Sequence, residues 1–241
     1  MKIISWNLLR LVGASPDEVA DLVAREAPDV LLMQEATAQI DRLPQIIGGH
    51  YMRRLLPGRV HGLAVWSRQR PVAAPTVVVL PQGSMFRRIG LVVDLGDFSV
   101  ANVHLSHGQV LNRRQLWRIA STLPPRAAVL GDFNDSPEAA VVRSVAGDLA
   151  DMPRGRHADL ELTASLERGI LHHCVKAVPP GQRHTILYRG VGQQVDHILV
   201  SRALWRRFRG ARVLNENLRD GTGEGREDVE SDHAAVVATF S

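Results

Sequence analysis

Short apolar runs that lead directly into polar residues occur along the chain. The clearest is AAVL at 127–130, which is followed at once by GDFND at 131–135. A run of this kind is typical of a buried strand, and the polar groups after it are expected at the end of a sheet, where α/β proteins commonly hold their functional residues. The chain is therefore expected to contain a buried sheet with a polar edge.

Other local patterns extend this expectation. Ser15-Pro16-Asp17-Glu18 supplies a helix cap, a proline at the first helical position and a capping-box glutamate. Further helices are predicted at 109–123 and from Ser136, whereas 146–181 is poorly patterned. Strands are predicted at 2–8, 29–35, 62–67, 76–80, 88–94, 98–105, 127–132, 194–200, 205–209 and 234–240. Helices interspersed with several consecutive strands favour an α/β layered fold with mixed sheets.

Length and composition indicate one globular domain over residues 1–241. The chain is 45% hydrophobic and 22% charged, and it has no internal repeat or low-complexity linker. It contains no apolar window long enough for a transmembrane segment, and its start reads as a strand, so a cytoplasmic location is expected. Cys174 is the sole cysteine, which excludes an internal disulfide and a thiolate metal cluster. Any metal would be held by oxygens or imidazoles.

The charged residues are compatible with an anionic substrate. There are 29 basic and 25 acidic residues, and all the basic ones except Lys2 and Lys176 are arginines. Arginine suits phosphate because its planar fork donates two parallel hydrogen bonds. A coding bias that favours arginine is the better explanation for most of these arginines. A net charge of +4 does not choose among nucleotides, lipids and sugar phosphates.

The polar groups at strand ends and in loops form a chemically coherent set. Each taken alone is also typical of a cap, a turn or a hydrogen-bonded core residue. Carboxylate and amide oxygens suit Mg²⁺ or Mn²⁺, histidine exchanges protons near neutral pH, and an acid beside a histidine orients its ring. Together they indicate metal-assisted attack of water on phosphorus. The set comprises Asn7, Glu35, His104, Asp132, Asn134, Asp196, Asp232 and His233.

Six short motifs in this order resemble the endonuclease/exonuclease/phosphatase superfamily: WN at 6–7, QE at 34–35, NVHL at 102–105, GDFN at 131–134, VDHI at 195–198 and SDH at 231–233. This superfamily includes pancreatic-type deoxyribonucleases, exonuclease-III-type abasic-site endonucleases, neutral sphingomyelinases and inositol polyphosphate 5-phosphatases. The resemblance implies a four-layered α/β sandwich, with two mixed β-sheets packed face to face and helices outside. It also implies a divalent-metal phosphoesterase site at one edge.

The resemblance implies a role for each member of the set. Glu35 would be the principal ligand of Mg²⁺ or Mn²⁺, with Asn7 and Asp232 near the metal. The remaining groups would be catalytic or would bind the phosphate.

Among those groups, Asp196 and His233 would form an acid–histidine dyad, and Asp132 and Asn134 would position or activate the water and hold the phosphate. His104 would bind the phosphate or protonate the leaving oxygen. Asp132 and His233 are both candidates for the general base, and His233 also for phosphate binding.

His104 bears on the branch of the superfamily. The abasic-site enzymes resemble one another in having tyrosine at this place, whereas the deoxyribonuclease and sphingomyelinase branches have histidine. This chain resembles the second group. A carboxylate partner for His104, as found in the pancreatic-type nucleases, is not evident between residues 50 and 75.

Three functions remain open from the sequence. The first is a phosphodiesterase or phosphomonoesterase acting on a small or lipid-derived phosphate ester, and the second is a DNA endonuclease or exonuclease with the same mechanism, so nucleic acid is a possible partner. The third is an inactive binding module, which the intact polar set disfavours. The loops at 106–112, 146–190 and 215–230 carry no pattern that selects a substrate, and nothing indicates an oligomeric state.

Overall fold

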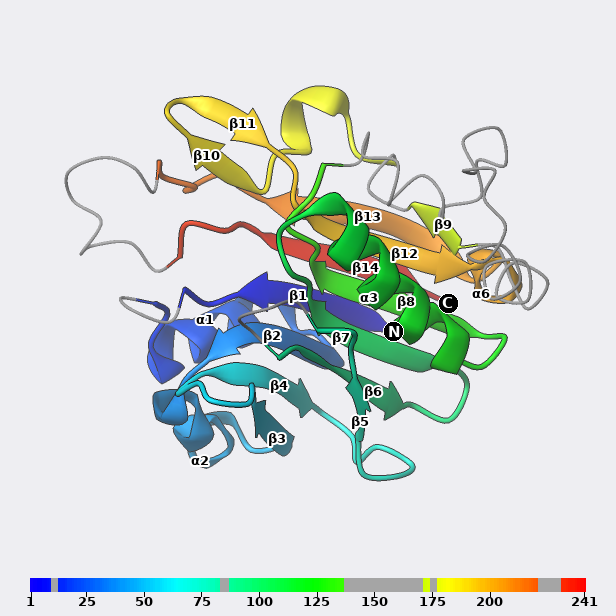
Figure 1. Cartoon of the computed structure of the whole chain (residues 1–241). Coiled ribbons are helices and arrows are strands. Elements are labelled where there is room, and N and C mark those ends of the chain that lie inside the picture. Colours follow the sequence, from blue (N-terminus) through cyan, green and yellow to red (C-terminus); the bar gives the residue numbers. More distant parts are fainter. Residues whose placement is uncertain (10–12, 83–86, 137–170, 174–176, 221–230) are drawn as a thin grey trace, which may run out of the picture.

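The computed structural model describes residues 1–9, 13–82, 87–136, 171–173, 177–220 and 231–241. Two six-stranded mixed sheets pack face to face, and helices lie on the outside (Figure 1). The helix predicted from Ser136 and most of the poorly patterned segment 146–181 lie outside the described residues. Within the described part, no helix is long and apolar enough to cross a membrane.

Sheet A has the strand order β13-β14-β1-β2-β4-β3. Its strands are β1 (Lys2–Asn7), β2 (Val30–Ala36), β3 (His50–Leu55), β4 (Gly62–Ser67), β13 (Phe208–Leu214) and β14 (Ala235–Phe240).

Sheet B has the order β5-β6-β7-β8-β12-β9. Its strands are β5 (Thr76–Val79), β6 (Ile89–Asp94), β7 (Ser99–His104), β8 (Ala127–Asp132), β9 (Leu171–His173) and β12 (Asp196–Ser201). A separate hairpin consists of β10 (Ile186–Tyr188) and β11 (Val191–Gln193).

The helices are α1 (Pro16–Glu26), the 3₁₀ helix η1 (Ala38–Arg42), α2 (Leu43–Ile47), α3 (Gln109–Thr122), the 3₁₀ helix η4 (Pro180–Gln182) and α6 (Arg202–Trp205). The predicted capping box at the start of α1 is confirmed, since Ser15 Oγ accepts from Glu18 N and Glu18 Oε2 accepts from Ser15 N. The apolar residues of α1 recur at helical spacing, which gives the helix one face to bury.

The predicted four layers are confirmed. Val19, Leu22 and Val23 of α1 pack in a core cluster on the outer face of sheet A. Leu116 and Ile119 of α3 pack in a second cluster on the outer face of sheet B. The largest cluster lies between the sheets and includes Ile3, Leu32, Leu91, Leu130, Ile198 and Val236. Burial of these apolar faces on both sides of each sheet holds the sandwich together.

Strand pairing gathers the polar strand ends at one edge of the molecule. Strand β7 runs parallel to β8, so His104 pairs with Asp132, and β12 runs antiparallel to β8, so Asp196 also pairs with Asp132. In sheet A, β1 runs parallel to β2, and Asn7 pairs with Gln34. Each sheet therefore brings its share of the predicted set to the same end of its strands.

One predicted strand is wrong, and the sequence analysis did not predict β3, α2 or the β10–β11 hairpin. The segment 205–209 is not one strand, because Trp205 ends α6 and β13 begins at Phe208, with the two rings stacked at 5.0 Å. Strand β3 was missed, and its residues are partly or fully exposed. An edge strand of this kind lacks the alternation of buried and exposed residues on which a sequence reading depends.

A buried amide fastens the sheets together near the polar edge. Asn102 in β7 donates from Nδ2 to Met33 O at 3.0 Å and to Ala64 O at 2.9 Å, and its Oδ1 accepts from Gln34 Nε2 at 2.7 Å. The register between β2 and β4 shifts just after Met33. Asn102 thus donates to the backbone of sheet A beside its register shift, at Met33, two residues before Glu35.

Replacing Asn102 with leucine is expected to lower the free energy of unfolding by roughly 3 kcal/mol, because each buried polar group left without a partner costs about 1–3 kcal/mol. Urea unfolding measures the change. The exposed Asn217→Leu is the matched control and is expected to stay within about 0.5 kcal/mol of the wild type. Equal costs at the two positions would contradict the fastening role.

Candidate active site

Asp132 lies at the centre of the polar edge. It is 1% exposed. Its Oδ2 accepts from Asn7 Nδ2 at 3.0 Å and lies 3.4 Å from His104 Nε2 and 3.9 Å from His233 Nε2. Its Oδ1 accepts from the backbone N of Asn134 at 2.8 Å. One buried carboxylate therefore contacts four other members of the predicted set.

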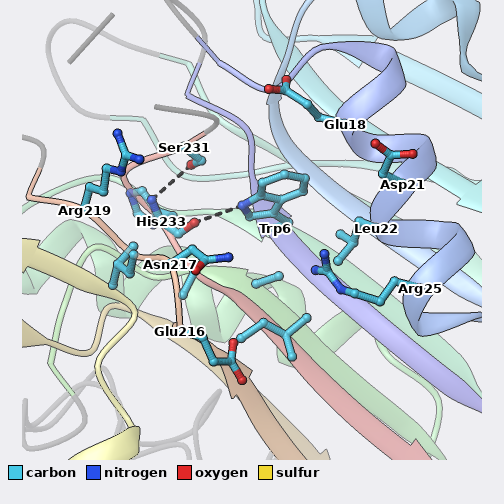
Figure 2. A pocket seen from close by; sticks show the side chains of 14 residues that line it. Trp6, Glu18, Asp21, Leu22, Arg25, Glu216, Asn217, Arg219, Ser231 and His233 are labelled. Carbon is cyan, nitrogen blue, oxygen red and sulfur yellow. Dashed lines mark hydrogen bonds between the residues drawn. The ribbon is translucent and has the colours of Figure 1, made fainter. Parts of the chain in front are cut away.

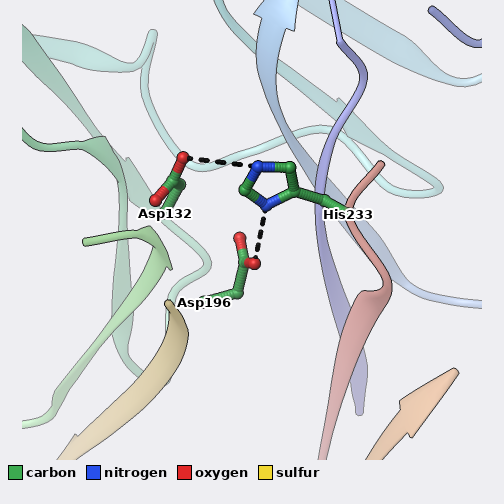
Figure 3. Close-up of side chains that lie close together, drawn as sticks. All are labelled: Asp132, Asp196 and His233. Atoms are coloured by element: carbon green, nitrogen blue, oxygen red, sulfur yellow. Dashed lines mark hydrogen bonds and ion pairs between the residues drawn. The ribbon is translucent and has the colours of Figure 1, made fainter. Parts of the chain in front are cut away.

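His233 and Asp196 form a close pair beside it (Figure 3). His233 Nδ1 lies 2.8 Å from Asp196 Oδ2. Asp196 is itself held by Thr185, a fully buried residue whose Oγ1 accepts from the backbone N of Asp196 at 3.1 Å. His233 Nδ1 thus pairs with the Asp196 carboxylate, as in an acid–histidine dyad, and its Nε2 lies 3.9 Å from Asp132 Oδ2.

The main chain of His233 is also held, as Figure 2 shows. Trp6 Nε1 donates to His233 O at 2.9 Å, and Ser231 Oγ accepts from His233 N at 3.0 Å. The same hydroxyl donates to Asn7 O at 2.6 Å. A polar cavity of about 350 Å³ lies against this segment, between α1 and residues 214–219. The bonds on both sides fix the ring of His233 relative to β1.

The buried charges shift the pKa values of these groups. Burial raises the pKa of Asp132 to about 7; His233 opposes this shift and the Asp196 carboxylate adds to it. Burial acts to lower the pKa of His233, but the carboxylates of Asp196 and Asp132 outweigh it and raise that pKa to about 10. Near neutral pH, His233 is therefore an imidazolium, and Asp132 is a carboxyl group poised to gain or lose a proton.

His104 differs from His233. Burial lowers the pKa of His104 well below its usual value, and the positive charge of Arg88 adds to the effect. Its ring is therefore neutral near pH 7. Within the described part of the chain, its buried Nδ1 has no hydrogen-bond partner. The carboxylate next to this ring is Asp132, from the neighbouring strand, and not a residue between 50 and 75.

Two members of the set adopt left-handed backbone conformations. Glu35 has φ 55° and Asn134 has φ 51°, a region that costs a residue with a side chain more than glycine. Glu35 follows the fully buried Gln34 and is partly exposed. Asn134 donates from Nδ2 to Leu105 O at 2.9 Å. Glu35 lies at the register shift of β2, and Asn134 follows the end of β8 by two residues.

Two places at this edge of the molecule offer ligand atoms to a cation. Asp132, Asp196 and His233 offer ligand atoms that all lie within 4.8 Å of one another, but the hydrogen bond between His233 and Asp196 already uses two of these groups. Asp232 has a buried Oδ1 to which no described residue donates a hydrogen bond. It lies 3.9 Å from His233 Nε2, and a carboxylate oxygen that accepts no hydrogen bond is available to ligate a cation.

The structure thus brings Asn7, His104, Asp132, Asn134, Asp196, Asp232 and His233 to one edge, with Glu35 placed there by the pairing of β1 and β2. Sequence reasoning gave no role to Ser231, Asn112 or Gln115. Asn112 donates to Phe133 O, and Gln115 Oε1 accepts from Ser106 N at 2.9 Å, so both hold the loops that follow β7 and β8. The signal available in the sequence was that Asn112 and Gln115 are polar residues on the face of the predicted helix that is buried.

Comparisons with known proteins agree with this fold. The sequence profile described as the Endonuclease/Exonuclease/phosphatase family matches residues 4–233. A search of curated proteins finds no match to the chain.

Among solved structures, the 3′ phosphatase NExo from Neisseria bound to product DNA hairpin is 25% identical, with a TM-score of 0.65, covering 100% of this chain and 99% of that one. An AP endonuclease from Archaeoglobus fulgidus is 20% identical, with a TM-score of 0.68 and coverage of 100% and 99%. The human Nocturnin catalytic domain with bound sulfate anion is 17% identical, with a TM-score of 0.69 and coverage of 100% and 94%.

Asp132→Asn tests the cost of burying this carboxyl group. Its pKa is about 7 in the folded protein against 3.8 ordinarily, so the wild type loses stability as pH rises from about 4 to about 7. Asparagine does not titrate, so the difference in Tm is expected to shift in favour of the variant over this range. Thermal unfolding of both proteins at each pH measures it. The exposed Asp97→Asn is the control; a flat difference for Asp132→Asn as well would contradict the expectation.

Proposed function

The chain belongs to the Endonuclease/Exonuclease/phosphatase family, and from this premise we propose that it is a divalent-metal-dependent hydrolase that cleaves phosphate esters by attack of water on phosphorus. The observation that carries the proposal is the position of Asp132, which contacts Asn7, His104 and the His233–Asp196 pair. Buried groups with opposed pKa shifts in one site are typical of acid–base chemistry.

Glu35, with Asn7 and Asp232, would hold Mg²⁺ or Mn²⁺. The donors are carboxylate and amide oxygens, which suit these ions, and the buried Asp232 Oδ1 without a described hydrogen-bond donor supports a cation at this place. When bound, the ion would supply positive charge to a phosphoryl oxygen.

The other steps of the reaction are assigned to side chains of the protein. The oxygen of water bonds to phosphorus, its proton passes to Asp132, and the bond between phosphorus and the leaving oxygen breaks. A carboxyl group with a pKa of about 7 suits a general base near neutral pH. The His233 imidazolium, oriented by Asp196, stabilises the negative charge on the phosphoryl group, with Asn134 beside it. The leaving oxygen takes its proton from the His233 imidazolium, and His104, which is neutral near pH 7, would bind the phosphate.

DNA ends are a second candidate substrate. The 25% identical structure is a 3′ phosphatase bound to product DNA hairpin, and the two chains cover each other almost completely. The net charge of +4 is compatible with a polyanion. Binding to DNA would weaken steeply with salt, because each phosphate contact releases counterions.

A substrate panel tests the function. The purified chain, with Mg²⁺, Mn²⁺ or EDTA, is offered a chromogenic phosphodiester, DNA carrying a 3′ phosphate, abasic duplex, plasmid, a sphingomyelin-type lipid and inositol phosphates. Turnover that EDTA abolishes is expected, with Glu35→Gln inactive because the metal is lost. Turnover that does not need metal would refute the mechanism. Absence of turnover on every substrate would favour an inactive binding module.

Asp196→Asn tests the dyad. Without the carboxylate, the pKa of His233 is expected to fall from about 10 toward its usual value of about 6.5. The ring then loses its charge near neutral pH, and kcat should drop by about 10²–10⁴-fold. An NMR titration of the His233 ring and steady-state kinetics measure the two effects. Asp97→Asn, at an exposed carboxylate, should change neither; an unshifted His233 in Asp196→Asn would overturn the assigned orientation.

A further inference from the structure

A second cavity, of about 440 Å³, opens beside Glu35. Its walls come from the two segments that leave β1 and β2 at the polar edge. Leu8, Leu9 and Ala14 follow Asn7 on one side, and Thr37 to Ile40 follow Glu35 on the other. A ligand held at Asn7 and Glu35 would therefore have this cavity as its direct neighbour.

Most of the described side chains that line this cavity are apolar. Leu8, Leu9, Ala14 and Ile40 are each less than 9% exposed and form the floor. At the rim, Val60 is 81% exposed, next to Ala38 and Gln39. Among the lining residues that the structure describes, Glu35 is the single charged side chain. The Glu35 carboxylate would repel a second phosphate placed here, and the apolar floor favours an uncharged group.

The cavity wall is tied to the site. Leu9 has φ 54°, and its backbone N donates to Asn7 Oδ1 at 3.2 Å. Ala14 N donates to Leu8 O at 3.1 Å and closes the turn. A Cβ at Gly13 would come within 1.6 Å of Leu8 O, so this turn requires glycine. The apolar wall is therefore held in place by the same asparagine that contacts Asp132.

The other side of the site holds the two histidine rings. His104 Nε2 lies 3.4 Å and His233 Nε2 lies 3.9 Å from Asp132 Oδ2. A phosphate ester bound between the two sides would place its anionic phosphoryl group toward the histidines. One ester arm would then extend past Glu35 into the apolar cavity.

From this arrangement we propose that the cavity beside Glu35 is a specificity subsite that binds an uncharged, apolar group esterified to the phosphate. The proposal rests on the proposed function and deepens it, because it names the kind of ester that the site accepts. Burying an apolar arm here supplies binding that a methyl ester cannot.

The test compares phenyl 4-nitrophenyl phosphate with methyl 4-nitrophenyl phosphate. The two share the leaving group and the charge and differ in the other arm. With Mn²⁺, the wild type is expected to prefer the phenyl ester in kcat/KM by at least about tenfold. Ala38→Trp, which fills the cavity, and Val60→Asp, which adds a charge to its rim, are each expected to bring this ratio close to one.

The matched control for Ala38→Trp is Ala24→Trp, on the exposed side of α1. The matched control for Val60→Asp is Val72→Asp, at a valine that is 69% exposed and whose backbone N donates to Asp94 O at the end of β6. Both should keep the wild-type ratio. A wild-type ratio near one, or a preference that survives both Ala38→Trp and Val60→Asp, would overturn the subsite.

Binding distinguishes failure of the subsite from failure of the proposed function. Calorimetric titration of the full chain with phenyl phosphate and with methyl phosphate, in Mg²⁺, needs no turnover. Tighter binding of phenyl phosphate that Ala38→Trp removes supports the subsite even if neither diester is hydrolysed. Equal binding of the two phosphates, alongside metal-dependent hydrolysis, would reject the subsite and leave the hydrolase intact.

Discussion

The hydrogen bond from Asn7 to Asp132 joins the two sheets at the point where both supply functional groups. Asn7 ends β1 in sheet A, and Asp132 ends β8 in sheet B, 125 residues later. The carbonyl of Asn7 also accepts from Ser231, which in turn holds the backbone of His233. Because neither sheet alone carries the whole set, the site depends on the apolar core that presses the sheets together.

That arrangement has a cost in stability. Asp132 is buried among other ionisable groups, and Glu35 and Asn134 hold left-handed backbone conformations. Each of these features is unfavourable by itself and persists only because surrounding structure imposes it. Asn102 contributes to that constraint from inside the core, where its amide donates to the carbonyls of the paired residues Met33 and Ala64, just before the register shift. Strained and buried polar positions therefore collect at one edge, while the rest of the sandwich follows ordinary rules of burial.

Local patterns in the sequence predicted the parts of the fold that local physics determines. The capping box at Ser15 and the apolar runs of β4 and β8 needed no tertiary information. Pairings such as Asn7 with Asp132 depend on packing over long sequence separations, and only the family resemblance placed those residues together. Buried amides such as Asn102 and Gln115 escaped prediction because a polar residue in a sequence is usually exposed. Strand β3 was not predicted because a strand at the edge of a sheet needs no buried face, so its sequence lacks an apolar pattern.

The two sides of the site bear differently on specificity. The side that contains Asp132, His104 and the His233–Asp196 pair is built on strand ends, so its geometry is fixed by register and by the core. The apolar side is built on the short segments that follow β1 and β2, with a rim residue, Val60, that makes little contact with the fold. Substitutions at such a rim cost the sandwich little. It follows that the choice of ester can change on this side without disturbing the groups that would act on phosphorus, which is how one fold can host many substrates.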